Sequence, residues 1–275
     1  MLDLNPAPAM STDPATLLSA LVSAELPRLY GFAYVMCGAR DEAYTHVLEA
    51  IRDLTADAAA VLAAPRPGDV LLGRLARRLE EALGRKADQS FVILDNLLRS
   101  DETREIDPYQ PPIDGDLTRV RPLLWELKRT CLASVLGCLP PGVRLSFVVT
   151  DLLGYTPAAA ADLLGIKESA FRVRLTRARR RLEDYLAPRC GHIDRHNPCY
   201  CEGRLTLALE TGFVRLPPHT ADIPPENYNE GPEQRDIAGL YRTLPAVALT
   251  EQQHATLRDA IAAATAAPTL AEAAG

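Results

Sequence analysis

Basic residues are concentrated in one stretch of this 275-residue chain, between Lys167 and Arg181. The stretch contains seven basic residues and one acidic residue, Glu168, so it carries a charge of +6. The whole chain carries −6, which leaves −12 on the remainder. A local basic surface on an acidic protein is the charge pattern that attracts nucleic-acid phosphates. The alternative is a solvated arginine-rich face, but like charges at helical spacing repel one another, so nucleic-acid binding is favoured.

A second group of reactive side chains lies between Cys190 and Cys201. The pairs Cys190-x-His192 and Cys199-x-Cys201 flank a turn-forming sequence, Asp-Arg-His-Asn-Pro. Residues two apart in an extended segment point the same way. Two such arms could therefore present three thiolates and one imidazole to a tetrahedral zinc ion. Two alternatives remain open: a thiol switch that uses Cys199 and Cys201, and a cysteine-bearing loop that packs against the basic helix without chemistry.

Motifs of catalysis are missing from the sequence. The five histidines are too scattered to form a catalytic set, and there is no Gly-rich phosphate loop, nucleophile elbow or His-Glu metalloprotease pattern. We therefore expect no enzymatic activity and no required cofactor, apart from a structural zinc ion if the Cys190–Cys201 segment binds one.

Composition points to a cytoplasmic, helical protein. Alanine and leucine dominate and β-branched runs are few, which predicts an all-α fold. No apolar run reaches membrane-spanning length, and the N-terminus lacks the pattern of a secretory signal. The six cysteines do not form the framework of a small secreted disulfide protein, which indicates a reducing compartment.

The basic stretch is expected to be the second helix of a helix-turn-helix. Thr156 should cap a short helix that begins at Pro157 and stops at Gly165. A longer helix should then run from Lys167 to Leu186, because Pro188 prevents its continuation. Its apolar residues recur at helical spacing and should face the core: Phe171, Leu175, Ala178 and Leu182.

The segment from Leu139 to Leu186 resembles region 4 of bacterial sigma-70-type RNA polymerase sigma factors, specifically the extracytoplasmic-function (ECF) group. The resemblance rests on Leu-Pro-Pro-Gly at 139–142, the apolar triplet at 147–149, the Ala-rich helix at 158–164 and Arg-Ala-Arg-Arg-Arg-Leu at 177–182. It covers about a fifth of the chain. It implies that the basic helix binds a promoter −35 element in the major groove.

In such a complex the first residues of the recognition helix read bases, and later ones hold phosphates. Base contacts are expected from Lys167, Glu168, Ser169, Arg172 and Arg174, and phosphate or surface contacts from Arg177, Arg179, Arg180 and Arg181. The family often has Gly-Thr where this chain has Ser169-Ala170, so its base preference does not carry over.

Residues 14–100 are expected to form a first helical domain. Its helices should lie near 17–33, 40–54 and 70–83, with Pro27 as a kink or break in the first and Gly38 at its end. Pro65-Arg66-Pro67-Gly68 should separate the second helix from the third.

This layout resembles sigma region 2, which binds the polymerase and melts the −10 element. The matching motifs are Leu-Pro-Arg-Leu-Tyr at 26–30, Arg-Asp-Glu-Ala at 40–43 and Gly-Arg-Leu-Ala-Arg-Arg at 73–78. The resemblance implies polymerase contacts by Val47 and Glu49, and a second DNA-binding set made of Arg74, Arg77 and Arg78. Leu71 stands where the family usually has an aromatic residue, and extruded bases usually stack on aromatic rings.

The remaining segments complete the predicted domain organisation. Residues 1–13 should form a mobile leader, 101–120 a flexible linker, 121–187 the region 4-like domain, and 188–275 a Cys-containing segment and C-terminal extension. Trp125, Cys131 and Cys138 are expected to be packing residues of the first region 4 helix. Short helices are expected at 204–209, 237–244 and 251–264.

The sequence thus predicts an ECF-type sigma factor whose partners are core RNA polymerase and promoter DNA, with no membrane association. An anti-sigma or other regulatory protein is a further candidate partner. Two alternatives stay open: a sigma-like DNA-binding regulator that does not melt promoters, and a protein-interaction adaptor that binds no DNA. Salt-sensitive DNA binding would separate the adaptor from the other two.

Overall fold

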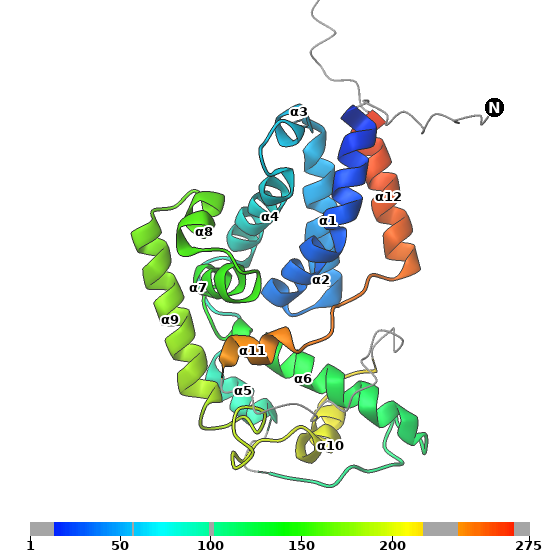
Figure 1. The fold of residues 1–275 in the computed structure, drawn as a ribbon. Helices are drawn as coiled ribbons and strands as arrows, with labels where there is room; N and C mark the ends of the chain where they lie inside the picture. The colour runs from blue at the N-terminus through cyan, green and yellow to red at the C-terminus, as the bar shows by residue number, and fades with distance from the viewer. Residues whose placement is uncertain (1–13, 57, 99–101, 217–235, 267–275) are drawn as a thin grey trace, which may run out of the picture.

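The computed structural model describes residues 14–56, 58–98, 102–216 and 236–266, and these are built from helices (Figure 1). No strand occurs in these ranges, where the one isolated bridge pairs Cys190 with Cys199. The all-α prediction is confirmed. The predicted leader, residues 1–13, lies outside the described residues.

The N-terminal half contains four α-helices and one 3₁₀ turn. They are α1 (Pro14–Cys37), α2 (Arg40–Arg52), η1 (Asp53–Ala56), α3 (Ala58–Leu62) and α4 (Pro67–Leu83). Pro27 lies inside α1 and does not break it, because Leu26 and Leu29 are buried on either side of it. Gly38 ends α1 as predicted, with a positive φ of 78° that favours glycine. The helix predicted after Pro65 is α4.

The middle of the chain forms a second set of helices. They are α5 (Phe91–Leu98), η2 (Leu117–Arg119), α6 (Val120–Gly137), α7 (Pro141–Phe147), a π-helical turn η3 (Val148–Leu152), α8 (Pro157–Leu164) and α9 (Glu168–Leu186). Trp125 is 5% exposed, as expected for a packing residue. It belongs to a small second core with Leu124, Leu127 and residues of α10 (Glu202–Glu210).

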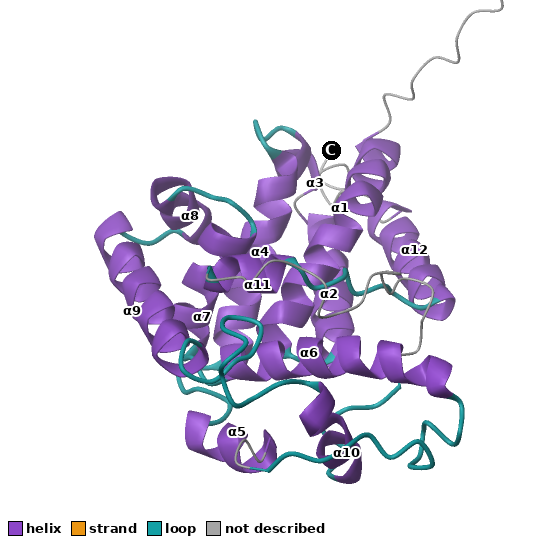
Figure 2. Cartoon of the chain, turned by 60° about the horizontal axis from the view of Figure 1, so that its bottom comes forward, coloured by secondary structure: helices purple, strands orange, loops and turns teal. Residues whose placement is uncertain are grey.

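The two predicted domains share one hydrophobic core. Buried residues of α1, α2 and α4 continue without interruption into those of α7, α8 and α9. Helix α4 packs on both α7 and α8, and Figures 1 and 2 show these helices side by side. The domain limits therefore stay a prediction, because packing does not separate the two units.

The predicted linker has a defined course between residues 102 and 116. The backbone N–H of Arg104 donates to the Gly203 carbonyl at 3.1 Å, and that of Asp107 donates to Thr206 Oγ1 at 3.2 Å. Gln110 Nε2 donates to the Thr206 carbonyl at 3.1 Å. Polar groups of this stretch therefore bond to α10, and the flexibility of the linker stays a prediction.

The C-terminal extension returns to the start of the chain. Helix α11 (Ile237–Arg242) lies against α9 and η3, and α12 (Glu251–Ala266) packs along α1 and α2 (Figure 1). The Tyr241 hydroxyl donates to the Leu132 carbonyl at 2.9 Å. Leu257 and Ile261, predicted as the apolar residues of the last helix, are 0% and 3% exposed.

A buried arginine of α7 joins the helices of both halves. Arg144 is 1% exposed, and its guanidinium donates to the Met36 carbonyl at the end of α1 and to Asp88 Oδ2 at 2.6 Å. It also donates to the carbonyls of Gly137 and Leu139 at 3.3 and 3.2 Å. One cation thus satisfies three backbone carbonyls at the junction of α1, α6 and α7.

Removing this cation should destabilise the whole fold. Arg144→Met keeps much of the side-chain volume but removes the donor to the Met36 and Leu139 carbonyls, whereas the Gly137 carbonyl still accepts from the Asp88 N–H. We expect the free energy of unfolding to fall by about 3 kcal/mol, measured by urea denaturation. Arg180→Met is the control, because Arg180 is 82% exposed and pairs only with exposed Asp184, so its loss should change stability by less than about 0.5 kcal/mol. Equal midpoints for both variants would contradict the role given to Arg144.

Candidate nucleic-acid interface

Helices α8 and α9 form the helix-turn-helix at the limits that the sequence predicted. Thr156 caps α8, since its Oγ1 accepts from the Ala159 N–H at 3.2 Å. Gly165 ends α8 in the left-handed region with φ 68°, and its N–H donates to the Asp162 carbonyl. These local hydrogen bonds therefore fix where α8 begins and ends, and with that the direction in which α9 starts.

Helix α9 has an apolar and a basic face, as predicted. Phe171, Leu175, Ala178 and Leu182 are at most 4% exposed. The polar face is exposed at Lys167, Glu168, Ser169, Arg172, Arg177, Arg179, Arg180 and Arg181. The structure therefore brings these predicted DNA-binding residues to one surface of one helix.

Two arginines of this set are engaged in contacts with other helices. Arg174 is half-buried and pairs with Glu80 of α4 at 2.8 Å. Arg179 makes a bidentate contact with Asp151, at 2.9 Å from Nε and 2.6 Å from Nη2, and this carboxylate raises the pKa of Arg179. These two therefore hold α9 against the protein, whatever else they bind.

Two further arginines pair along α9 itself. Arg172 lies 2.6 Å from Glu168, and Arg180 lies 3.7 Å from Asp184, both one turn apart. Such exposed pairs are weak and screened by salt, so they compete poorly with a phosphate.

The second predicted DNA-binding set, on α4, is in part occupied by protein contacts. Arg77 donates to the Leu163 carbonyl of α8 at 2.9 Å. Arg78 pairs with Asp53 at 2.8 Å and also with Glu49. Arg74 is half-buried beside the core. Leu71 is buried, so no side chain at that position is available to a base.

The two predicted polymerase-binding residues differ in accessibility. Val47 is 1% exposed and belongs to the core, so its side chain does not reach a partner at this surface. Glu49 is exposed at 41%, and its hydrogen bond with Arg78 lowers its pKa. Polymerase contact by this helix therefore stays a prediction that rests on Glu49.

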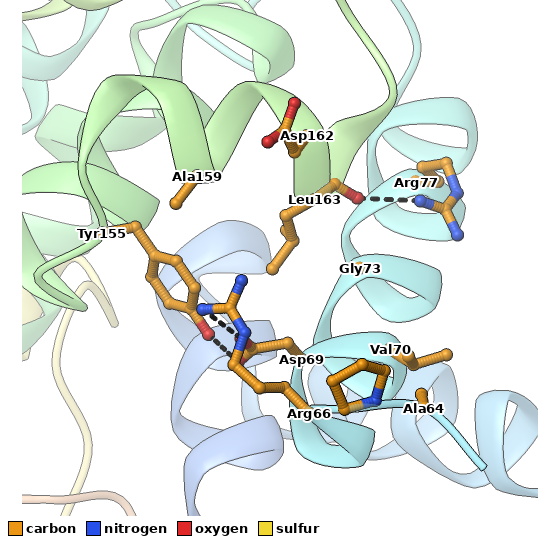
Figure 3. A pocket seen from close by; sticks show the side chains of 11 residues that line it. Ala64, Arg66, Asp69, Val70, Gly73, Arg77, Tyr155, Ala159, Asp162 and Leu163 are labelled. Carbon is orange, nitrogen blue, oxygen red and sulfur yellow. Dashed lines mark hydrogen bonds and ion pairs between the residues drawn. The ribbon is translucent and has the colours of Figure 1, made fainter. Parts of the chain in front are cut away.

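A groove of about 360 Å³ lies between α4 and α8 (Figure 3). At its rim the Tyr155 hydroxyl donates to Asp69, and Arg28 donates to both. Burial raises the pKa of Asp69, but the bonds from Tyr155 and Arg28 outweigh this and leave it below the usual value. Burial and the Asp69 carboxylate raise the pKa of Tyr155 to about 12. This network ties the helix-turn-helix to α1 and α4.

The four proposed metal ligands belong to one loop after α9. The N–H of Gly191 donates to the Cys199 carbonyl at 2.8 Å, so the two arms run beside each other. The Cys201 Sγ lies 3.5 Å from His192 Nε2. Burial and the nearby Lys128 lower the pKa of His192 to about 3, so its imidazole is neutral.

Cys131 of α6 lies within electrostatic range of this segment. It was predicted as a packing residue of the first region 4 helix, and spacing along the chain gives no signal of its position. Burial raises the pKa of its thiol well above the usual value, and the thiols of Cys199, Cys201 and Cys190 raise it further. Cys138, in contrast, is buried and donates to the Ser134 carbonyl.

In the described part of the chain, one group of residues brings three possible metal-ligand atoms within 4.8 Å of one another. This group lies away from the Cys190–Cys201 segment. It is made of Cys37, Glu42 and His46, at the turn from α1 to α2. The sequence analysis missed it, although Glu42 and His46 stand one helical turn apart. The ligand atoms of the Cys190–Cys201 segment are thus less tightly gathered in this structure.

Comparison with known families identifies the helix-turn-helix. Residues 129–182 match sigma-70 region 4. The match spans 54 of the 275 residues and covers α7, α8, the second half of α6 and most of α9. The region 4 domain is a transcription-factor domain of a non-enzymatic class, which supports the predicted DNA-binding role of α9.

The comparisons extend no further along the chain. No curated protein and no solved structure is significantly similar to it. In the described part of the chain, every helix is too short or too polar to span a bilayer.

The contact between α4 and the region 4 domain can be tested at a glycine. A Cβ on Gly73 would lie 2.8 Å from the Leu163 carbonyl oxygen, which is backbone and cannot turn away. Gly73→Ala should therefore lower the free energy of unfolding by about 1–2 kcal/mol despite its better helix propensity. Gly31→Ala, in α1, has nothing within 4 Å of the new atom and should raise it by about 0.5–1 kcal/mol. Urea denaturation compares the two; stabilisation by both would mean that α4 and α8 do not touch in solution.

Proposed function

We propose that this protein is a transcription initiation factor of the ECF sigma type, which binds core RNA polymerase and directs it to promoters. The observation that carries the proposal is the exposed basic face of α9, on a helix-turn-helix that matches sigma-70 region 4. A cytoplasmic location follows from this role, since promoter DNA and the polymerase are there.

In this function the start of α9 reads bases in the major groove. Lys167, Ser169 and Arg172 are exposed within the first residues of α9 or just before it, where a recognition helix approaches base edges. Arg177, Arg180 and Arg181 lie further along and suit phosphate oxygens. The positive end of the helix dipole adds to the attraction for DNA.

A second candidate is a sigma-like regulator that binds DNA but does not melt promoters. It is favoured by α4, where Arg77 and Arg78 make protein contacts and Leu71 is buried. A sigma factor must expose this helix when it engages the −10 element, so the groove between α4 and α8 would have to open.

Binding to purified core RNA polymerase, followed by run-off transcription on genomic fragments, tests the proposal. Stable binding and specific transcripts are expected of a sigma factor. DNA binding without polymerase binding would favour the regulator. A chain that binds an anti-sigma-type protein, but no DNA at any salt concentration, would be an adaptor.

Two arginines of α9 should separate base reading from phosphate binding. Arg172→Ala should reduce discrimination between cognate and mutated −35 sequences by about 1–3 kcal/mol. Arg181→Ala is the matched control; it should weaken binding to all sequences alike and lower the slope of log K against log salt by about 1. Fluorescence anisotropy at several salt concentrations measures both. Equal weakening on all sequences by Arg172→Ala would make it a phosphate contact.

A further inference from the structure

Three side chains of types that bind transition metals converge at the turn from α1 to α2. Cys37 is the last residue of α1, and Glu42 and His46 lie one turn apart on α2. The Cys37 sulfur, a Glu42 carboxylate oxygen and a His46 ring nitrogen all lie within 4.8 Å of one another. In a tetrahedral zinc site, bonds of about 2.0–2.3 Å place the ligand atoms about 3.3–3.6 Å apart. Side-chain movements of roughly 1 Å would therefore close this group around an ion.

The backbone of this turn is held from both sides. Gly38 reverses the chain with its positive φ of 78°. Before the turn, the Met36 carbonyl at the end of α1 accepts from the buried Arg144. After it, Arg40 Nη2 at the start of α2 donates to Glu126 Oε2 of α6 at 3.0 Å. The end of α1 and the first turn of α2 are therefore positioned before any ion binds, which lowers the cost of assembling a site there.

The imidazole of His46 is not used by other contacts of the protein. Its side chain is only 14% exposed, and Nδ1 is buried without a hydrogen-bond partner among the described residues. Nε2 lies 4.0 Å from Glu42 Oε1, which is too far for a hydrogen bond. A buried polar atom without a partner is costly, and neutral imidazole is the commonest metal ligand in proteins. A bound ion would thus give this ring the partner that it lacks.

The charges of the three side chains match those of a divalent ion. A Cys37 thiolate and the Glu42 carboxylate together balance a divalent cation, and a neutral imidazole adds no charge, so the half-buried site would be neutral. Within the described ranges no lysine or arginine pairs with Glu42, which leaves its carboxylate available. Thiolate and imidazole ligands suit zinc, whereas magnesium and calcium prefer oxygen. The Glu42 side chain is 46% exposed, so water can reach the remaining ligand position.

We propose that Cys37, Glu42 and His46 bind one zinc ion, with water as the fourth ligand. The Cys37 thiol loses its proton to solvent when the bond from sulfur to zinc forms. The ion ties the end of α1 to α2, so the zinc-bound protein is more stable than the metal-free one. The site lies apart from the basic face of α9, and it does not depend on the proposed sigma activity.

A change at the exposed carboxylate tests the site without disturbing the fold. The full chain is freed of metal with a chelator, and its zinc affinity is then measured by competition with a chromogenic chelator. Glu42→Gln should lower the affinity at least about tenfold. Asp41→Asn is the matched control, because it removes the same charge from an exposed neighbour in the same turn of α2, and it should leave the affinity unchanged. Equal losses in both variants, or no zinc binding by the unchanged chain, would overturn the proposal.

Cobalt substitution tests whether the thiol is a ligand. The cobalt-substituted full chain should show thiolate-to-metal absorption that Cys37→Ser reduces and Cys138→Ser leaves unchanged. Zinc should raise the melting temperature of the unchanged chain but not that of Cys37→Ser, and the two should melt alike when free of metal, which shows that the variant folds. Absorption that is unchanged in Cys37→Ser but lost in Cys199→Ser would overturn the proposal and place the metal in the Cys190–Cys201 segment.

The imidazole is tested in the same way. His46→Gln should lower zinc affinity at least about tenfold. His196→Gln is the control, since this histidine is 83% exposed and lies in the loop after α9, and it should have no effect. Unchanged zinc affinity in His46→Gln would overturn the proposed ligand set.

Discussion

The buried guanidinium of Arg144 is the interaction on which the arrangement of the helices depends. Burial of a charged group is costly unless it is paired and hydrogen bonded, and at 1% exposure both terminal nitrogens of Arg144 donate, to carbonyls at the ends of α1 and α6 and to Asp88, while its Nε has no partner in the described residues. Helix ends carry unpaired carbonyls and partial negative charge, so one cation serves several of them at once. Because these ends belong to both halves of the chain, the first helical unit and the region 4 domain are held in a fixed relation.

Because of this fixed relation, the basic residues of α9 and those of α4 differ in how accessible they are to DNA. Helix α9 pairs with α4 through Arg174 and Glu80 but keeps most of its other cations in solvent, whereas Arg77 of α4 donates to the end of α8. Tyr155, Asp69 and Arg28 close the rim of the groove between them. DNA binding by α9 alone therefore needs no rearrangement, but engagement of α4 requires that α8 move. DNA binding by α9 alone is compatible with the regulator, whereas engagement of α4 is required of an initiation factor.

Local signals in the sequence were sufficient for the helix-turn-helix. The Thr156 cap, the Gly165 turn and the spacing of Phe171, Leu175 and Leu182 each act within a few residues, and the structure confirms them. The burial of Arg144 and the packing of α12 on α1 depend instead on contacts between segments far apart in the chain. No periodicity or spacing records such contacts, and the hydrogen bonds of residues 104–110 to α10 are of the same kind. Val47 was predicted to contact the polymerase but is buried, because a family motif gives residue types and not their burial.

Part of the positive charge of α9 is available to a ligand, because some of its arginines are held by partly buried acids and others only by exposed ones. Arg174, with 32% of its side chain exposed and Glu80 at 29%, is held by a partly buried partner on another helix. Arg180 and Asp184 are 82% and 69% exposed, and a pair in that setting contributes little. Phosphates can therefore replace the exposed acids without disturbing the packing of α9. Since the rest of the chain carries the opposite net charge, this distribution would attract DNA to α9 rather than to the acidic remainder, and so orient the protein before any base is read.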